Sequence, residues 1–272
     1  MNVKSILTSS IGLTNSTNEP TMQTSSLVNS TIANDAPIYE LQFKYATASM
    51  ILLANFNSFI LDWTARFSVG GTHLNFFIVK QLPILQPITF MNNYKYNMTY
   101  IDFIAPRALE LIYTAWDMES FANELDYNAP PFIWNDERRF LIRCELDAIF
   151  FHLYLGDKNE WRQNNNHDLN KYFATSHDVV DYVMDTFTIV KRNDEKIYNS
   201  YRTKNIILEI YDEMAEAIHQ NNLAEANGQP ATANYKTRLN PPPGPPLDVD
   251  GFFIPLDKWD PAHWPPHIHR PR

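Results

Sequence analysis

A pair of glycines followed by three hydrogen-bonding side chains is the part of this sequence best suited to chemistry. Gly70 and Gly71 stand together, although the chain contains only 7 glycines among its 272 residues. Paired glycines let the backbone adopt positive φ angles and leave its amides uncovered. Thr72, His73 and Asn75 follow, and their side chains could meet a phosphate or a base edge. A connection between two elements with no binding role is the alternative that residue types alone leave open.

Cationic side chains stand on both sides of this turn. Arg66 precedes it and Lys80 follows it. Further basic side chains lie at residues 138–143 and 191–204, where each group could simply face solvent. Proteins contact DNA phosphates mainly through Lys and Arg. We therefore expect a DNA-binding site made of Arg66, Gly70, Gly71, Thr72, His73, Asn75 and Lys80.

Other constellations predict neither catalysis nor a metal site. In residues 128–132, Asn-Ala-Pro-Pro-Phe, an alanine interrupts the Asn-Pro-Pro pattern of amino-methylating DNA enzymes, and a rigid loop explains the segment better. His263, His267 and His269 lack a second group of ligands at metal-binding spacing. The only cysteine, Cys144, is expected in the core. Helix-surface ion pairs are expected for a set of spaced carboxylates: Glu137, Glu145, Asp147, Asp181 and Asp185.

Hydrophobic spacing predicts the elements that must position the turn. Apolar residues recur every three or four positions from 41 to 67, which predicts a helix that the two glycines end. The apolar run at 74–80 predicts a buried strand, followed by an extended connector at Pro83 and Pro87. Further predictions are a helix from Pro106 to about 125, a helix capped by Asn135, a helix capped by Ser176, and a helix over about 194–220.

The composition limits the classes of protein to which this chain can belong. A hydrophobic content of 44% and an aromatic content of 14% are typical of a globular chain. The net charge of −9 argues against binding nucleic acid through bulk charge, but it leaves a local basic face open. Residues 46–61 are too short and too polar to span a bilayer, and no signal peptide is evident. One cysteine fits a reducing compartment, so we expect a cytoplasmic protein without membrane contact.

Several segments resemble one family of enzymes. These motif segments are residues 53–83, which contain Val-Gly-Gly-Thr-His-Leu-Asn-Phe-Phe-Ile-Val-Lys-Gln-Leu-Pro; 130–134, Pro-Pro-Phe-Ile-Trp; 138–148, Arg-Arg-Phe-Leu-Ile-Arg-Cys-Glu-Leu-Asp-Ala; 151–154, Phe-His-Leu-Tyr; 180–192, Val-Asp-Tyr-Val-Met-Asp-Thr-Phe-Thr-Ile-Val-Lys-Arg; and 201–204, Tyr-Arg-Thr-Lys. In order and spacing they resemble the C-terminal, target-recognition and helical region of type IIG-like adenine-specific DNA methyltransferases. Those enzymes belong to bacterial restriction–modification and phage-defence systems. The chain departs from the family pattern at Pro20, at 23–32 and at 156–175.

The resemblance implies a function for the chain. It would be the last part of a longer enzyme, a DNA-recognition and scaffold fragment that binds double-stranded DNA. S-adenosylmethionine would bind the missing methylase core, which methylates a flipped adenine, so no cofactor and no methyl-transfer residue is expected in this chain.

The fold class implied is α+β and mostly helical, with a small β region of a target-recognition domain, then a helical domain and a Pro-rich tail. We expect a polar arm or poorly defined strands at 1–38, the end of a target-recognition-like domain at 39–100, a helical domain at 101–222 and the tail at 223–272.

Two other functions remain open. The chain could be a protein-interaction module that docks onto a methylase or helicase subunit through its helical half and its Pro-rich tail, which the acidic balance favours. A metal-dependent nuclease is the other, and the carboxylate spacing disfavours it.

Overall fold

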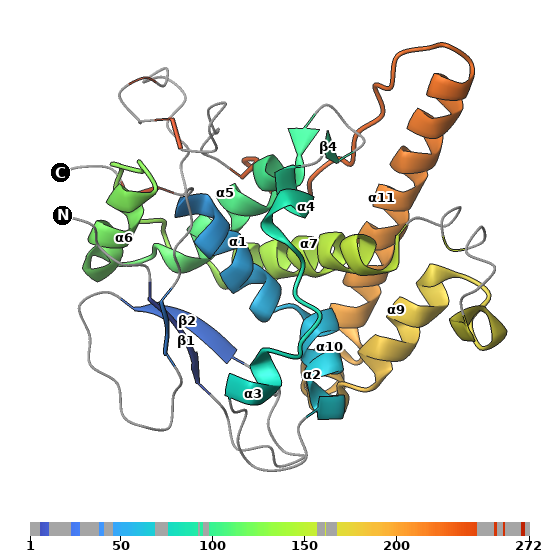
Figure 1. Cartoon of the computed structure of the whole chain (residues 1–272), viewed down its shortest axis with the longest axis horizontal. Helices are drawn as coiled ribbons and strands as arrows, with labels where there is room; N and C mark the ends of the chain where they lie inside the picture. Colours follow the sequence, from blue (N-terminus) through green and yellow to red (C-terminus); the bar gives the residue numbers. More distant parts are fainter. Residues whose placement is uncertain are drawn as a thin grey trace.

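Helices dominate the structure, as the sequence predicts (Figure 1). The computed structural model describes residues 6–10, 23–27, 38–40, 46–68, 76–91, 93–94, 98–156, 161, 168–243, 253–254, 258 and 268–269. The helices there are α1 (Ala46–Phe56), α2 (Phe59–Ser68), α3 (Phe76–Val79), α4 (Pro87–Met91), α5 (Tyr100–Ile112), α6 (Glu119–Glu124), α7 (Asp136–Leu155), α9 (Ser176–Asp185), α10 (Thr188–Tyr198) and α11 (Arg202–Ala226), with 3-10 turns η1 (Trp116–Met118) and η2 (Asp168–Lys171). None of these helices combines the length and the apolar character needed to cross a lipid bilayer.

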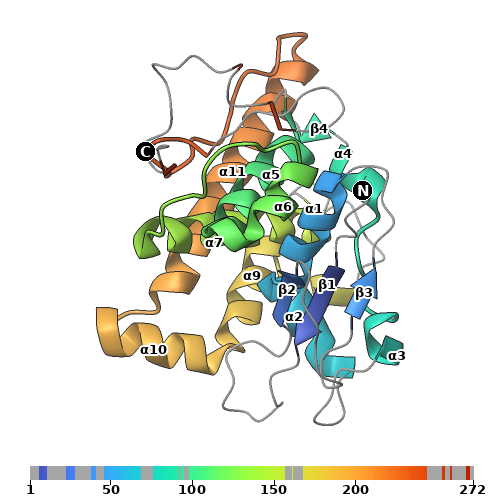
Figure 2. The same ribbon diagram turned by 90° about the vertical axis from the view of Figure 1, so that its left-hand side faces the viewer.

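Short strands precede α1 and separate α4 from α5. The first three are β1 (Ile6–Ser10), β2 (Gln23–Leu27) and β3 (Ile38–Glu40), which form an antiparallel sheet in the order β2-β1-β3. The register pairs Ile6 with Leu27 on one side and with Glu40 on the other. A second antiparallel pair joins β4 (Asn93–Tyr94) to β5 (Met98–Thr99). The sheet lies beside α1, which β2 contacts (Figure 2).

The long helix α7 lies across the middle of the molecule, where α11 crosses it (Figure 1). Its start is confirmed as predicted: the Asn135 side chain accepts a hydrogen bond from the backbone of Arg138, and Asp136 occupies the first turn. An acidic first turn and a capped N-terminus both favour a helix beginning there. Gly156 ends it with a φ of 73°, which a residue with a β-carbon adopts only at a cost.

Three clusters of apolar side chains form the core. The largest joins α7, α9 and α11, with Cys144, Val183 and Ile210 among its buried members. A second cluster packs α5 and α6 against the loop that leads to α7. The third packs α1 and α2 against α3 and the residues after it. Cys144 is 1% exposed, so its prediction as a core residue is confirmed.

Two buried arginine–glutamate pairs join α5 to α7. Arg107 of α5 donates from Nε to Glu145 of α7 at 2.7 Å. In the opposite sense, Arg138 of α7 donates from Nε and Nη2 to the two carboxylate oxygens of Glu110, at 2.5 and 3.0 Å. All four side chains are at most 10% exposed. We call these four residues the buried ion-pair network, and each charge in it has a partner, as burial requires.

The segment after α11 covers this network. Tyr235 and Thr237 donate their hydroxyl groups to Oε1 of Glu145, at 2.9 and 2.7 Å, and the backbone N–H of Arg238 donates to the same oxygen at 2.9 Å. The carbonyl of Pro241 accepts from Nη1 of Arg138 at 2.7 Å. This part of the Pro-rich tail is therefore packed on the helical body.

The strand predicted at 74–80 is wrong, because the structure has helix α3 there. Val79 and Leu82 are buried against the third cluster, three residues apart, while Phe77 is 74% exposed. Phe77 and Val79 are two residues apart and would share one face of a strand, so their unequal burial fits a helix. Four consecutive apolar residues show neither the helical nor the strand spacing, so the sequence could not distinguish a helix from a strand here.

Helix boundaries also differ from the prediction. The helix expected over 41–67 is divided into α1 and α2 at residues 57–58, where the Asn57 and Ser58 side chains bond to the carbonyls of Leu53 and Asn55. Pro106 lies inside α5 instead of opening it, because Thr99 and Asp102 form a capping box farther upstream.

Three further boundaries also differ from the prediction. Thr175, with Asp178, caps α9 in place of Ser176. The helix expected over 194–220 is two helices, separated where Asn199 adopts a left-handed conformation with φ of 54°. Pro87 begins the short helix α4 and does not extend the connector.

The carboxylates expected in surface ion pairs fall into two groups. Asp181 and Asp185 both contact Lys204, at 2.7 and 3.0 Å, and Glu137 contacts Arg202, so the prediction is confirmed for these three. It is wrong for Glu145 and Asp147, which are 0% and 7% exposed. Their partners come from segments distant in sequence, and this tertiary burial overrides the helical pattern.

We expect Glu145→Ala to lower the free energy of unfolding by about 3–5 kcal/mol, because it leaves the Arg107 guanidinium buried without its partner. Urea denaturation measures the change. The control is Glu137→Ala on the same helix, whose side chain is 58% exposed and whose loss costs less than about 1 kcal/mol. Equal losses in the two variants would contradict the role of the buried ion-pair network.

Candidate functional site

The turn predicted to bind DNA lies between two described helices. Gly70, Gly71, Thr72, His73 and Asn75 fall outside the described residues. The last turn of α2 and the whole of α3 are described, and they contact each other.

The guanidinium of Arg66 holds the end of α2 against α9. It donates from Nε and Nη2 to Asp62 one turn earlier, at 3.1 and 2.9 Å, and from Nη1 to the Thr186 carbonyl at 3.5 Å. Its carbon also lies 3.9 Å from the centre of the Phe187 ring, close enough for a cation–π contact. Arg66 therefore fixes the direction in which α2 enters the turn.

Lys80, directly after α3, is exposed. Among the described carboxylates, none forms an ion pair with it. Phe67 and Phe77, on the two sides of the turn, are each 74% exposed. The Trp63 ring meets the Phe67 ring edge to face at 4.8 Å and orients it. The two ends that flank the turn thus present the exposed Lys80 ammonium group and two aromatic rings to solvent.

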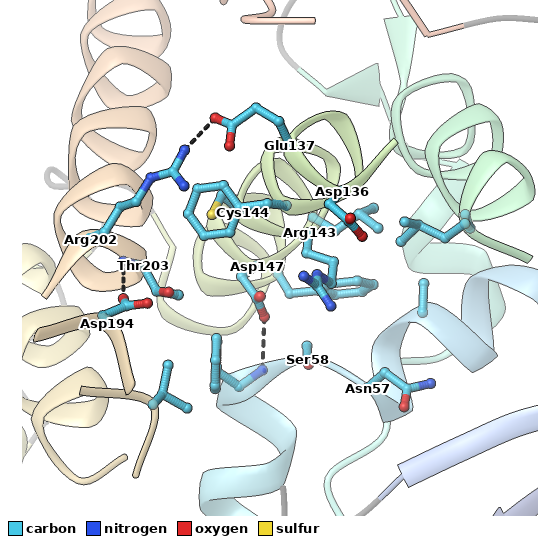
Figure 3. A pocket seen from close by; sticks show the side chains of 18 of the residues that line it. Asn57, Ser58, Asp136, Glu137, Arg143, Cys144, Asp147, Asp194, Arg202 and Thr203 are labelled. Atoms are coloured by element: carbon cyan, nitrogen blue, oxygen red, sulfur yellow. Dashed lines mark hydrogen bonds and ion pairs between the residues drawn. The ribbon is translucent and has the colours of Figure 1, made fainter. Parts of the chain in front are cut away.

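A cleft that the sequence did not predict lies over α7 (Figure 3). Its volume is about 840 Å³, and it is bounded by the junction of α1 and α2, by α5 and η1, and by α10 with the start of α11. Cys144 and Asp147 of α7 line it. Most pockets that hold a ligand have volumes of roughly 300–1,000 Å³, so this cleft has the size of a binding site.

Asp147 links this cleft to α2. Its Oδ1 accepts a hydrogen bond from the backbone N–H of Phe59, the first residue of α2, at 2.8 Å (Figure 3). A carboxylate at that position satisfies an unpaired amide and complements the helix dipole. Burial raises the pKa of Asp147 to about 7, although the Phe59 amide and the Arg143 charge act in the opposite direction.

Apart from Arg143, the other charged groups around the cleft are already bonded within the chain. Asp194 accepts from the backbone N–H of Thr203 at 2.6 Å, and Arg202 contacts Glu137 (Figure 3). The Arg202 guanidinium also lies over the Phe140 ring, 4.2 Å from its centre. Arg143 is exposed and has no ion-pair partner among the described carboxylates.

The groups in the cleft fit binding better than covalent chemistry. Burial holds the pKa of the Cys144 thiol well above its usual range, so the thiolate is disfavoured. Within the described part of the chain, no three His, Cys, Asp or Glu side chains are grouped as metal ligands. The cleft supplies carboxylates, one free guanidinium and apolar walls, which can hold a ligand by charge and by burial.

One sequence signal could have identified Asp147. It lies three residues after Cys144 and four before Phe151, on the apolar face of α7. A carboxylate at such a position must find a partner, and here the partner is the start of α2. No comparable signal marks Glu145, whose partners lie on α5 and in the tail.

Comparison with known proteins adds no relative: no family model, no curated protein and no solved structure matches this chain.

We expect Asp147→Asn to change how stability depends on pH. Between the usual carboxyl pKa of 3.8 and about 7, the folded chain keeps a proton that the unfolded chain loses, so the free energy of unfolding falls as pH rises. The variant retains an oxygen for the Phe59 amide and cannot ionise. Between pH 5 and pH 8 its free energy of unfolding, measured by urea denaturation, should rise by on the order of 2 kcal/mol relative to that of the wild type. If the unfolding free energies of the variant and the wild type changed with pH in parallel, the raised pKa of Asp147 would be excluded.

Proposed function

We propose that this chain is a DNA-recognition and scaffold fragment of an adenine-specific DNA methyltransferase of the restriction–modification type. One observation carries the proposal: the motif segments bind one another through side chains that belong to the motifs.

Three contacts illustrate this. Asp147, in segment 138–148, accepts from the amide of Phe59, in segment 53–83. Arg66, in the latter segment, donates to the carbonyl of Thr186, in segment 180–192. Tyr201, in segment 201–204, donates its hydroxyl to the Met184 carbonyl of segment 180–192 at 2.8 Å. Two of these contacts hold α2, the helix that leads into the turn, against α7 and the end of α9, and the third joins the start of α11 to α9.

In this proposal the turn after α2 reads DNA. Gly70 and Gly71 present backbone amides, and the polar side chains that follow them contact phosphates or base edges. Lys80 supplies a free positive charge, and Arg66 fixes the end of α2 in addition to any contact with DNA.

The wider architecture follows from the same proposal. The β region and residues 39–100 would end a target-recognition domain, and 101–222 would form the helical domain. The methylase core, with its S-adenosylmethionine, would belong to the rest of the enzyme, in the cytoplasm of a bacterium.

A protein-interaction module is the second candidate, and the net charge of −9 favours it. Docking through the helical half suits this candidate better than docking through the tail, because the described tail residues 235–241 are bonded to Glu145 and Arg138. DNA retention and partner pull-down with the same Lys80→Ala variant separate the two candidates: loss of DNA retention alone supports recognition.

We expect the chain to bind duplex DNA at low ionic strength, with an affinity that falls as salt rises. Lys80→Ala should weaken binding and reduce the slope of log affinity against log salt by about 1, because one phosphate contact is lost. Fluorescence anisotropy with a labelled duplex at several salt concentrations measures both quantities.

The matched control is Lys196→Ala, which removes an exposed lysine on α10. It should leave the slope unchanged. Arg66→Ala is a poor probe of DNA contact, since it also removes the bond to Thr186. Absence of binding at low salt, with or without a methylase partner, would refute the proposed function.

A further inference from the structure

The walls of the cleft over α7 are apolar on two opposite sides. Leu111, Ile112 and Met118 line the side formed by α5 and η1. Val190, Ile197 and Tyr198 line the side formed by α10. Ile197 is 69% exposed and Tyr198 is 47% exposed, and α10 has no buried residue along its whole length. This helix lies at the lower edge of the molecule (Figure 2), and its apolar side chains on the cleft are only partly covered.

Negative charge predominates between these walls. The lining includes four carboxylates, Asp136, Glu137, Asp147 and Asp194, and two guanidinium groups, Arg143 and Arg202. Glu137 and Arg202 contact each other, which leaves Asp136, Asp194 and, above its pKa of about 7, Asp147 to face the charge of Arg143. A ligand that complements the cleft therefore carries positive charge together with apolar surface.

From this complementarity we propose that the cleft over α7 docks a segment of a partner protein that presents one Lys or Arg side chain between apolar side chains. The basic head group would lie near Asp147 and Asp194, both of which are drawn below Cys144 in Figure 3. The flanking apolar side chains would pack on the walls formed by α5 with η1 and by α10.

The two carboxylates have capacity for such a head group. Asp147 accepts one backbone N–H from Phe59, and Asp194 accepts one from Thr203. A carboxylate has about four acceptor positions, so each retains some that an ammonium or guanidinium group can use. The aliphatic stem of Lys or Arg can lie against Phe140, which is only partly buried and also lines the cleft.

Arg143 limits the charge of the partner segment. It lies one helical turn before Asp147, and its charge partly offsets the rise that burial causes in the pKa of that carboxyl group. A ligand with several cations would meet this guanidinium, whereas one basic side chain among apolar ones would not. This proposal concerns a different surface from the DNA-binding turn and does not depend on the proposed function.

Selection from a random 12-residue peptide library on the immobilised chain tests the proposal. Peptides enriched on the wild type should carry a Lys or Arg between apolar residues. One enriched peptide, fluorescently labelled, is then titrated by anisotropy. In an assay above pH 8, where Asp147 is ionised, Asp147→Asn should weaken its binding at least about tenfold, because it removes the charge and keeps the acceptor for Phe59. Ile197→Ser, which removes apolar surface at an exposed position on the wall without adding charge, should also weaken it.

Asp126→Asn is the matched control. It makes the same chemical change at an exposed residue outside the cleft, and asparagine tolerates the left-handed φ of 60° found there. Its binding should equal that of wild type. Enrichment of acidic peptides, enrichment of none, or equal binding by wild type and Asp147→Asn would each overturn the proposal. DNA binding by these variants is measured in a separate assay, so the docking proposal and the DNA-recognition proposal can fail independently.

Discussion

The two buried arginine–glutamate pairs between α5 and α7 are the constraint on which the rest of the structure depends. Each pair can remain buried only if both helices keep their separation and orientation, because a displaced partner leaves a charge without compensation. Glu145 lies near the middle of α7, and α7 in turn contacts α2, α5 and α11. The network therefore fixes the position of the helix on which both the cleft and the approach to the turn are built.

The features that the sequence predicted are those set by local chemistry. Asn135 begins α7 as expected because an N-cap needs only the next three residues. Glu145 was expected on the surface because spaced carboxylates look the same whether their partner lies one turn away or 38 residues away, as Arg107 does. The strand expected at 74–80 failed for a similar reason, since the burial that selects a helix there comes from α1 and α2.

The candidate site also has parts that could be predicted from the sequence and parts that could not. Arg66, Lys80 and the glycine turn could be singled out from residue types, but the intramolecular contacts of Arg66 could not. The cleft could not be predicted, because α5, α7 and α10 supply its walls from three separate parts of the sequence. What connects the two sites is α2: its first residue bonds to Asp147, and its last residue leads into the turn. A helix of 10 residues is about 15 Å long, so a single rigid element joins them.

The bonds from the tail to Glu145 have a consequence for synthesis of the chain. Tyr235, Thr237 and Arg238 leave the ribosome some 90 residues after Glu145, so this carboxylate has no access to those three donors when α7 first emerges. Until then its Oε1 atom must remain hydrated or bind something else. The central helix can therefore reach its final, dry environment only after residue 238 has been translated.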